Sequence, residues 1–267
     1  MRRWLAGLAL IVLATVSVRS EDPRIASFSP GATQIILDLK SEAQIVAATR
    51  WCPLPTNHPA TRNCDAFVPD LEALIQVKPS LVVLPRLANP LWAERCQQAG
   101  LHTCLLNSEN ANSVTQDILT IGEAIGKKSA AEKIVAQFQK PSTQKTFKLM
   151  VIWDGMIAGT DSYLAQPLEH FGFQIIGTKT PWKKTDHELM LTLKPEVMLW
   201  ITSDGQDSTI TPYLDKQKEL LKIPGLGTLP CIKNGKIFQT TSGHRWLPGS
   251  GLLQLEADFS SLRQVLE

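Results

Sequence analysis

The sequence predicts an α/β protein with two similar lobes, each built on a mainly parallel sheet, joined by a long bridging helix. Three observations predict this class. Short apolar runs alternate with amphipathic helical runs, which is typical of parallel sheets. A helix–Lys–Pro–strand unit occurs twice at a constant offset of 116 residues. A long segment of helical periodicity separates the two copies. We therefore expect an N-terminal lobe over 22–110, a bridge over 111–144 and a C-terminal lobe over 145–267.

The elements of the first lobe follow from local composition, in chain order. The run RIASFS at 24–29 alternates as a strand does, and a helical pattern follows over 32–39. Residues 51–69 are rich in proline, so we expect an irregular loop there. The other expected elements are a strand over 44–49, a helix over 70–77, an apolar strand over 80–84, a helix over 90–100 that stops at Gly100, and a strand over 102–106.

The bridge is predicted from apolar residues that recur at helical spacing over 113–139. Gly126-Lys127-Lys128 leaves open a division into two collinear helices. The second lobe then repeats the alternation of strands and helices. Its expected strands are 148–153, 174–176, 196–201 and 236–239, and its expected helices are 162–171, 186–193, 215–221 and 252–265.

The internal repeat pairs PDLEALIQVKPSLVVL (69–84) with TDHELMLTLKPEVMLW (185–200). In each copy a short amphipathic helix ends at a Lys-Pro pair, because proline cannot continue a helix and disfavours helical conformation in the residue before it. The wholly apolar strand that follows suits a sheet covered on both faces. Two matched lobes with a cleft between them favour the binding of a small molecule.

The first twenty residues have the layout of an export signal. Two arginines precede an apolar run of fifteen residues from Trp4 to Val18, and Val18-Arg19-Ser20 resembles a cleavage site. Such a run is short for a permanent span, although an uncleaved N-terminal anchor is the alternative. We therefore expect residues 1–20 to be a signal peptide and the mature protein to be periplasmic or otherwise extracytoplasmic.

Cysteine spacing bears on disulfide pairing. Five cysteines fit an oxidising compartment. Their spacing favours the disulfides Cys52–Cys64 and Cys96–Cys104, each closing a short loop, and leaves Cys231 over. The sequence contains no CxxC motif, which disfavours a zinc cluster.

Charge and motifs exclude several functions. The net charge is +2 and basic residues form no run, which argues against a nucleic-acid partner. The five histidines show no HxH or HExxH spacing, and the sequence has no GxSxG, GxGxxG or Walker motif. We therefore expect a binding protein rather than an enzyme, with no cofactor and no metal site of its own. A secreted hydrolase is the alternative from another class.

Five segments together carry a family resemblance: residues 24–39, 69–84, 122–138, 159–173 and 181–200. The whole mature chain resembles a class III (helical-backbone) periplasmic substrate-binding protein of an ABC importer, and the closest pattern is the cobalamin-binding branch. The resemblance implies a monomer that captures cobalamin or a similar large chelate between its lobes and delivers it to a membrane permease. A ferric-siderophore or haem receptor of the same fold is the alternative.

The resemblance implies ligand contacts by aromatic residues on loops. In cobalamin-binding relatives, aromatic residues at the places of Trp51 and Trp182 face the corrin ring, and Phe67 would add a third wall. Loops at the carboxyl ends of parallel strands are where α/β sheets bind ligands. The alternative for each residue is packing on the lobe surface. Three tryptophans lie within helical or strand runs and are therefore expected in the core: Trp92, Trp153 and Trp200.

A second group of candidates lies on the loop after the last predicted strand. Relatives use this loop for ligand contacts, and here it holds His244, Arg245 and Trp246. Arg245 suits an anionic group such as a propionate, a phosphate or a siderophore carboxylate, and His244 could ligate a metal held in a chelate. Arg50 and Arg86 are similar candidates on other loops, with a plain surface role as the alternative.

Glu72 and Glu188 occupy corresponding positions near the start of the two repeat helices. In family members one exposed glutamate per lobe contacts arginines of the permease, so the resemblance implies that role for both. Two symmetrically placed carboxylates suit a two-fold symmetric partner. The alternative is a helix-start acid favoured by the helix dipole, with Asp70 and Asp186 as the caps just ahead.

Overall fold

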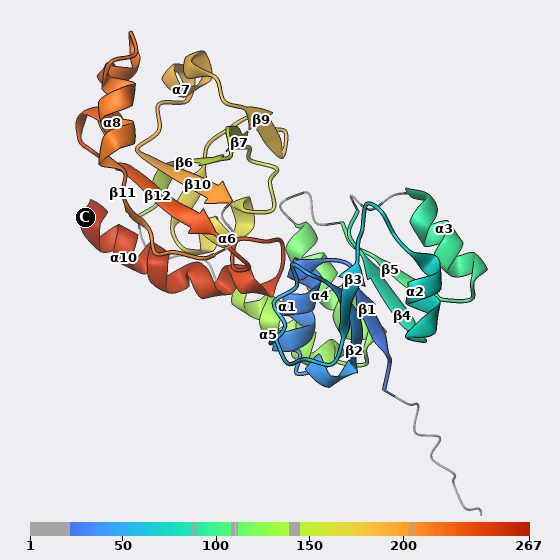
Figure 1. Cartoon of the computed structure of the whole chain (residues 1–267). Coiled ribbons are helices and arrows are strands. Elements are labelled where there is room, and N and C mark those ends of the chain that lie inside the picture. Colours follow the sequence, from blue (N-terminus) through green and yellow to red (C-terminus); the bar gives the residue numbers. More distant parts are fainter. Residues whose placement is uncertain are drawn as a thin grey trace, which may run out of the picture.

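The computed structural model describes residues 22–86, 88, 90–107, 110, 112–138, 145–203 and 206–267. The signal peptide expected over 1–20 lies outside these residues. Within the described part, no helix combines the length and the apolar character that crossing a bilayer requires. The chain forms two α/β lobes that lie side by side (Figure 1).

The first lobe is built on a sheet that has, within the described residues, five strands in the order β3-β2-β1-β4-β5, all paired in parallel. The strands are β1 (Ile25–Ser27), β2 (Ile45–Thr49), β3 (Thr61–Cys64), β4 (Leu81–Leu84) and β5 (His102–Leu105), and the helices are α1 (Pro30–Asp38), α2 (Leu71–Gln76) and α3 (Pro90–Gln98). The four predicted strands are confirmed. The edge strand β3 was not predicted, because the sequence TRNC has no apolar alternation.

The second lobe has a seven-stranded sheet among the described residues, in the order β11-β12-β10-β6-β7-β9, with β8 paired to β6. Its central pairings are parallel, whereas β7, β9 and β11 pair antiparallel. The strands are β6 (Phe147–Trp153), β7 (Met156–Ala158), β8 (Phe173–Ile175), β9 (Trp182–Lys184), β10 (Val197–Ser203), β11 (Thr211–Pro212) and β12 (Ile237–Ser242). The helices are α6 (Ala165–His170), α7 (His187–Leu193), α8 (Leu214–Leu221), α9 (Pro230–Lys233) and α10 (Glu256–Leu266), which the 3₁₀ helix η3 (Ser250–Leu255) precedes.

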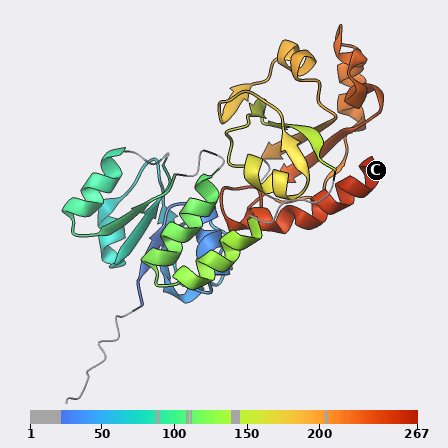
Figure 2. The same cartoon turned by 180° about the vertical axis from the view of Figure 1, so that it is seen from behind.

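The bridge consists of two helices, α4 (Ser113–Ala124) and α5 (Lys128–Phe138), rather than one long helix. The break falls at Gly126, whose φ of 69° ends α4 in the left-handed region that glycine tolerates. The two helices pack tightly side by side (Figure 2). A Cβ atom on Gly122 would lie 2.3 Å from the Cβ of Ala131. The bridge is therefore a folded-back pair, and the expectation of a single long helix is corrected.

Apolar side chains alternate between the two faces of each sheet, as a strand period of two requires. In the first lobe, Ile25 faces a central core and Ala26 faces an outer core beneath α2 and α3. In the second lobe, Leu149 belongs to the same central core and Met150 to a separate outer core. The central core also contains buried side chains of α1, α4, α5 and α10, so the two lobes share it.

The cysteines do not form the expected disulfides. All five cysteines lie in the described part of the chain and are free thiols. Cys52 and Cys104 belong to the central core, whereas Cys64 and Cys96 pack on the outer core across the first sheet, so each expected pair is divided by that sheet. Burial, with a smaller effect of Cys52, raises the pKa of the Cys64 thiol to about 12, and burial raises that of Cys96 to about 11. Both thiols therefore stay protonated at neutral pH.

The internal repeat is present in the structure. Asp70 caps α2 by accepting a hydrogen bond from the amide of Ala73, and Asp186 caps α7 by accepting one from the amide of Glu188. Each helix is followed by a lysine in the left-handed conformation, Lys78 with φ 46° and Lys194 with φ 48°. Because a proline follows each lysine, helical conformation is disfavoured there. The two copies thus share their caps and their turn.

A wedge formed by residues 247–251 of the second lobe contacts α1 of the first lobe. The carbonyl oxygen of Pro248 lies directly against Gly31. A Cβ atom added to Gly31 would lie 2.2 Å from that oxygen. The Ser250 hydroxyl donates a hydrogen bond of 2.6 Å to the Asp38 carboxylate. Asp38 also accepts one from the Gln34 amide at 3.0 Å. This inter-lobe wedge fixes the second lobe against α1 through backbone contact and hydrogen bonding.

Candidate ligand-binding cleft

Three cavities that share lining residues open where the central strands of both sheets end. The lobe-one cavity has a volume of about 510 Å³, the inter-lobe cavity about 630 Å³ and the lobe-two cavity about 270 Å³. The first two share Pro30, Arg50, Trp51 and Leu247, and the last two share Trp153 and Leu247. This location is the one at which open α/β sheets bind their ligands. We call the three cavities together the cleft.

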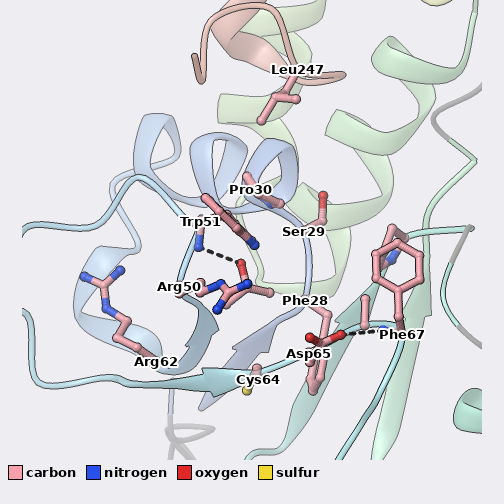
Figure 3. Close-up of a pocket in the computed structure, with 13 residues that line it drawn as sticks. Phe28, Ser29, Pro30, Arg50, Trp51, Arg62, Cys64, Asp65, Phe67 and Leu247 are labelled. Atoms are coloured by element: carbon pink, nitrogen blue, oxygen red, sulfur yellow. Dashed lines mark hydrogen bonds between the residues drawn. The ribbon is translucent and has the colours of Figure 1, made fainter. Parts of the chain in front are cut away.

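The lobe-one cavity is lined by residues that follow β1, β2, β3 and β4 (Figure 3). Two aromatic rings are its most exposed apolar walls: Trp51 is 62% exposed and Phe67 is 69% exposed. Large apolar rings left exposed on a folded protein mark binding surfaces when they gather at one place. The full lining is Phe28, Ser29, Pro30, Thr49, Arg50, Trp51, Arg62, Cys64, Asp65, Ala66, Phe67, Pro85 and Leu247.

Charged side chains give this cavity its polarity. The guanidinium of Arg50 lies 4.7 Å from the centroid of the Trp51 ring, a cation–π contact. Arg62 donates hydrogen bonds to backbone carbonyls of the 52–55 loop and keeps its charge at the wall. The Asp65 carboxylate accepts hydrogen bonds from the amides of Phe67 and Val68, and these bonds lower the pKa of Asp65. The wall thus carries two guanidinium groups and one ionised carboxylate.

Trp153 and Trp182 bring the second lobe to the cleft. Trp153 is the last residue of β6, is half-buried, and lines both the inter-lobe and the lobe-two cavity. Its indole N–H donates a hydrogen bond of 2.7 Å to the Ser203 hydroxyl, and its ring makes an edge contact with Trp182. Trp182 begins β9 rather than lying on a loop, and it lines the lobe-two cavity with Tyr163. The sequence predicts a place in the core for Trp153. Its position at the carboxyl end of a parallel strand is the sequence feature that could have indicated a place in the cleft.

The loop after β12 divides its residues between the cleft and the core. His244 is half-buried and lines the inter-lobe cavity. Trp246 is fully buried, so its ring does not face the cleft, and the expectation that it contacts the ligand is not supported. Its carbonyl accepts a hydrogen bond of 3.1 Å from the Tyr163 hydroxyl. Burial raises the pKa of Tyr163, so this donor stays protonated.

Arg245 is turned toward acidic residues of its own lobe. Its guanidinium lies 2.7 Å from the Asp258 carboxylate and 3.7 Å from that of Asp207. Asp207 also accepts hydrogen bonds from the backbone amides of Gly243 and Arg245. The sequence predicts that the Arg245 guanidinium meets an anionic group of the ligand. In the structure, the carboxylates of Asp207 and Asp258 compensate that positive charge instead. Arg245 instead holds the loop that presents His244 and Leu247.

Three other candidates do not line the three cavities of the cleft. Arg86 lines a neighbouring cavity of about 420 Å³ beside β4 and β5, which shares Pro85 with the lobe-one cavity, and it donates a hydrogen bond of 2.7 Å to the Asn107 side chain. Glu72 and Glu188 are exposed in the first turns of α2 and α7. Within the described residues, no group of three or more His, Cys, Asp and Glu side chains could hold a metal ion.

Replacing Arg245 with methionine should destabilise the protein and lower ligand affinity less than Arg50→Met does, because Arg245 holds the loop beside the cleft and does not itself line the cavities. Removing one partner of a mostly buried ion pair leaves a carboxylate uncompensated, and we expect a loss of roughly 2–4 kcal/mol in the free energy of unfolding. Thermal unfolding and ligand titration measure the two effects. Arg50→Met is the matched control, because exposed Arg50 should show the opposite pattern. A large loss of affinity in Arg245→Met at unchanged melting temperature would contradict this assignment.

Comparison with known proteins finds chains of the same fold. No curated protein shows a significant match to the chain. Solved structures do: the haem-binding protein HutB of Vibrio cholerae has a TM-score of 0.67 and 20% identity, covering 92% of this chain and 98% of its own. An ABC transporter substrate-binding protein from Listeria monocytogenes has a TM-score of 0.68 and 14% identity, over 91% and 98% of the two chains. The molybdate-binding protein MolA of Haemophilus influenzae has a TM-score of 0.63 and 16% identity, covering 91% of this chain and 86% of its own.

These structural likenesses, at such low identity, concern the fold. The family is shown by the sequence itself, because the family model described as periplasmic binding protein matches residues 25–243. That match runs from β1 of the first lobe to Gly243 just after β12 of the second, and so includes cleft residues of both lobes but not His244 or Leu247. The two lobes, the repeated unit and the cleft between the sheets all accord with it, and this chain belongs to the periplasmic binding protein family.

Proposed function

We propose that this protein is the extracytoplasmic receptor of an ABC importer and that it captures cobalamin or a similar large chelate in the cleft. The observation that carries the proposal is the set of aromatic rings that both lobes direct to contiguous cavities, Trp51 and Phe67 from the first and Trp153 and Trp182 from the second. Flat aromatic walls stack on the faces of a planar ligand. Arg50, at the junction of two cavities, would meet a negative group on its edge.

Cobalamin is the ligand that the sequence resemblance implies, and haem is the second candidate. His244 favours haem, because an imidazole at the inter-lobe cavity could ligate the iron while Arg50 meets a propionate. The haem-binding protein HutB has a similar fold, which also supports haem as a candidate ligand. A ferric siderophore fits the same polarity, with its carboxylates in place of propionates.

The proposal is tested by titrating the mature protein with cyanocobalamin, haemin and a ferric siderophore while following tryptophan fluorescence. At least one should bind with a dissociation constant below about 10 μM, a weak value for a dedicated receptor. If none binds, the proposed ligand classes are wrong. For haemin, His244→Ala should shift the Soret band if the imidazole ligates the iron, and Gln44→Ala, outside the cleft, should not. Turnover of ester or phosphate substrates would instead support a secreted hydrolase.

The partner in this proposal is the membrane permease. Glu72 and Glu188 follow equivalent caps on equivalent helices, one in each lobe, and both are exposed. A pair of carboxylates on two related lobes offers matching contacts to two copies of a basic surface. We propose that these residues dock the loaded receptor, and that the leader over 1–20 exports it.

A further inference from the structure

Leu247 has a place in the cleft that no other lining residue shares. It contributes to the walls of the lobe-one, inter-lobe and lobe-two cavities, whereas Trp51 and Trp153 each line two of them. Figure 3 shows its side chain extending from the second lobe toward Pro30 and Trp51 of the first. Its isobutyl group therefore stands where the three cavities meet.

The backbone that carries Leu247 is held on both sides. On the amino side, Arg245 is paired with Asp258 and the Trp246 ring is fully buried. On the carboxyl side, the Pro248 carbonyl lies against Gly31, and Ser250 is hydrogen-bonded to Asp38. Because these contacts fix the backbone, a ligand cannot displace the Cα atom of Leu247 without breaking the inter-lobe wedge.

We propose that Leu247 sets the ligand specificity of the cleft by acting as a fixed partition, so that thin planar chelates are accepted more readily than chelates with bulky groups on both faces. This inference rests on the proposed function and names the ligand shape that it selects. Leu247 narrows the cleft at the junction of its contiguous parts, whose volumes are about 510, 630 and 270 Å³. Truncating its side chain would widen this junction and admit a thicker ligand.

The test compares haemin, a thin planar chelate, with cyanocobalamin, whose corrin ring carries groups on both faces. Affinities of both probes are measured by equilibrium dialysis for the wild type, Leu247→Ala and Leu247→Phe. We expect Leu247→Ala to raise the ratio of cobalamin to haemin affinity by about tenfold or more, the discrimination that a few methylenes provide in an apolar pocket. Leu247→Phe should lower the same ratio.

Leu253→Ala is the matched control, because this leucine lies in the same segment but packs against the central core rather than lining the cleft. Its affinity ratio should equal that of the wild type. A ratio that stays within twofold in both Leu247 variants would overturn the inference, as would an equal rise in Leu253→Ala. If the ferric siderophore alone binds the wild type, the Leu247 inference is overturned and the proposed function stands. If haemin, cyanocobalamin and the ferric siderophore all fail to bind the wild type and the variants, the proposed function is overturned as well.

Discussion

Replacing Trp51 with alanine is expected to weaken ligand binding by roughly tenfold to a hundredfold, the effect of losing one aromatic stacking surface. The ring is 62% exposed and lines two of the three cavities, so a ligand in the cleft can cover apolar surface that the folded protein leaves open to solvent. The substitution also removes the platform on which the Arg50 guanidinium lies. Absorbance titration of the ligand measures the change without relying on tryptophan emission.

Two variants make this prediction specific. Trp51→Phe keeps a flat apolar ring and should retain most of the affinity. Trp200→Phe alters a tryptophan that packs beside the outer core of the second lobe, away from the cleft, and should leave affinity unchanged. If Trp51→Ala binds the ligand as tightly as the wild type, stacking on this ring is not part of recognition. Melting temperatures should agree among the variants at position 51, because the exposed ring contributes little to the core.

Reversing the charges of Glu72 and Glu188 together should reduce uptake to the background rate measured without the receptor, while ligand affinity stays at the wild-type value. Both carboxylates are exposed and lie in the first turns of their helices, outside the cleft. Converting them to lysine would set like charges against the basic surface that we propose on the permease. Transport of labelled ligand into membrane vesicles and binding in solution measure the two quantities separately.

The matched control is Glu94→Lys with Glu256→Lys, which reverses one exposed carboxylate in each lobe at positions unrelated by the repeat. It should transport normally. Single substitutions at Glu72 or Glu188 should give intermediate rates, because one docking contact remains. Normal uptake by the Glu72→Lys, Glu188→Lys protein would rule out the docking role and leave the two residues as helix-start acids.

The sequence predicted the parts of the fold that depend on strong periodicity and missed those that depend on tertiary contact. The central strands and the repeated unit were predictable because apolar runs and Lys-Pro turns act locally. The short strands β3, β7 and β9 were not, because each pairs at a sheet edge or in a hairpin, β3 and β9 lack an apolar run, and the apolar run of β7 is only three residues long. The disulfide expectation failed for a related reason, since spacing along the chain does not show that a sheet lies between two thiols.

Single residues of the cleft also show that sequence pattern does not predict features that depend on tertiary contact. Trp246 and Leu247 are neighbours in the chain, yet the first is fully buried and the second lines all three cavities. Residue type favoured the tryptophan as the ligand contact. Orientation reversed that expectation, because the contacts of Arg245 and Pro248 set which side chain faces the cleft. Trp51 and Phe67, by contrast, lie on loops just past parallel strands, where position alone was informative.

The inter-lobe wedge bears on how quickly the receptor fills and empties. Since Pro248 rests on Gly31 and Ser250 is bonded to Asp38, the walls of the cleft are already in place before a ligand arrives. Association rates fall when binding must wait for a conformational change, and they vary less than dissociation rates among related ligands. Capture should therefore be fast for every chelate that reaches the opening. Discrimination would then lie in residence time, and the receptor would deliver the molecules that stay longest.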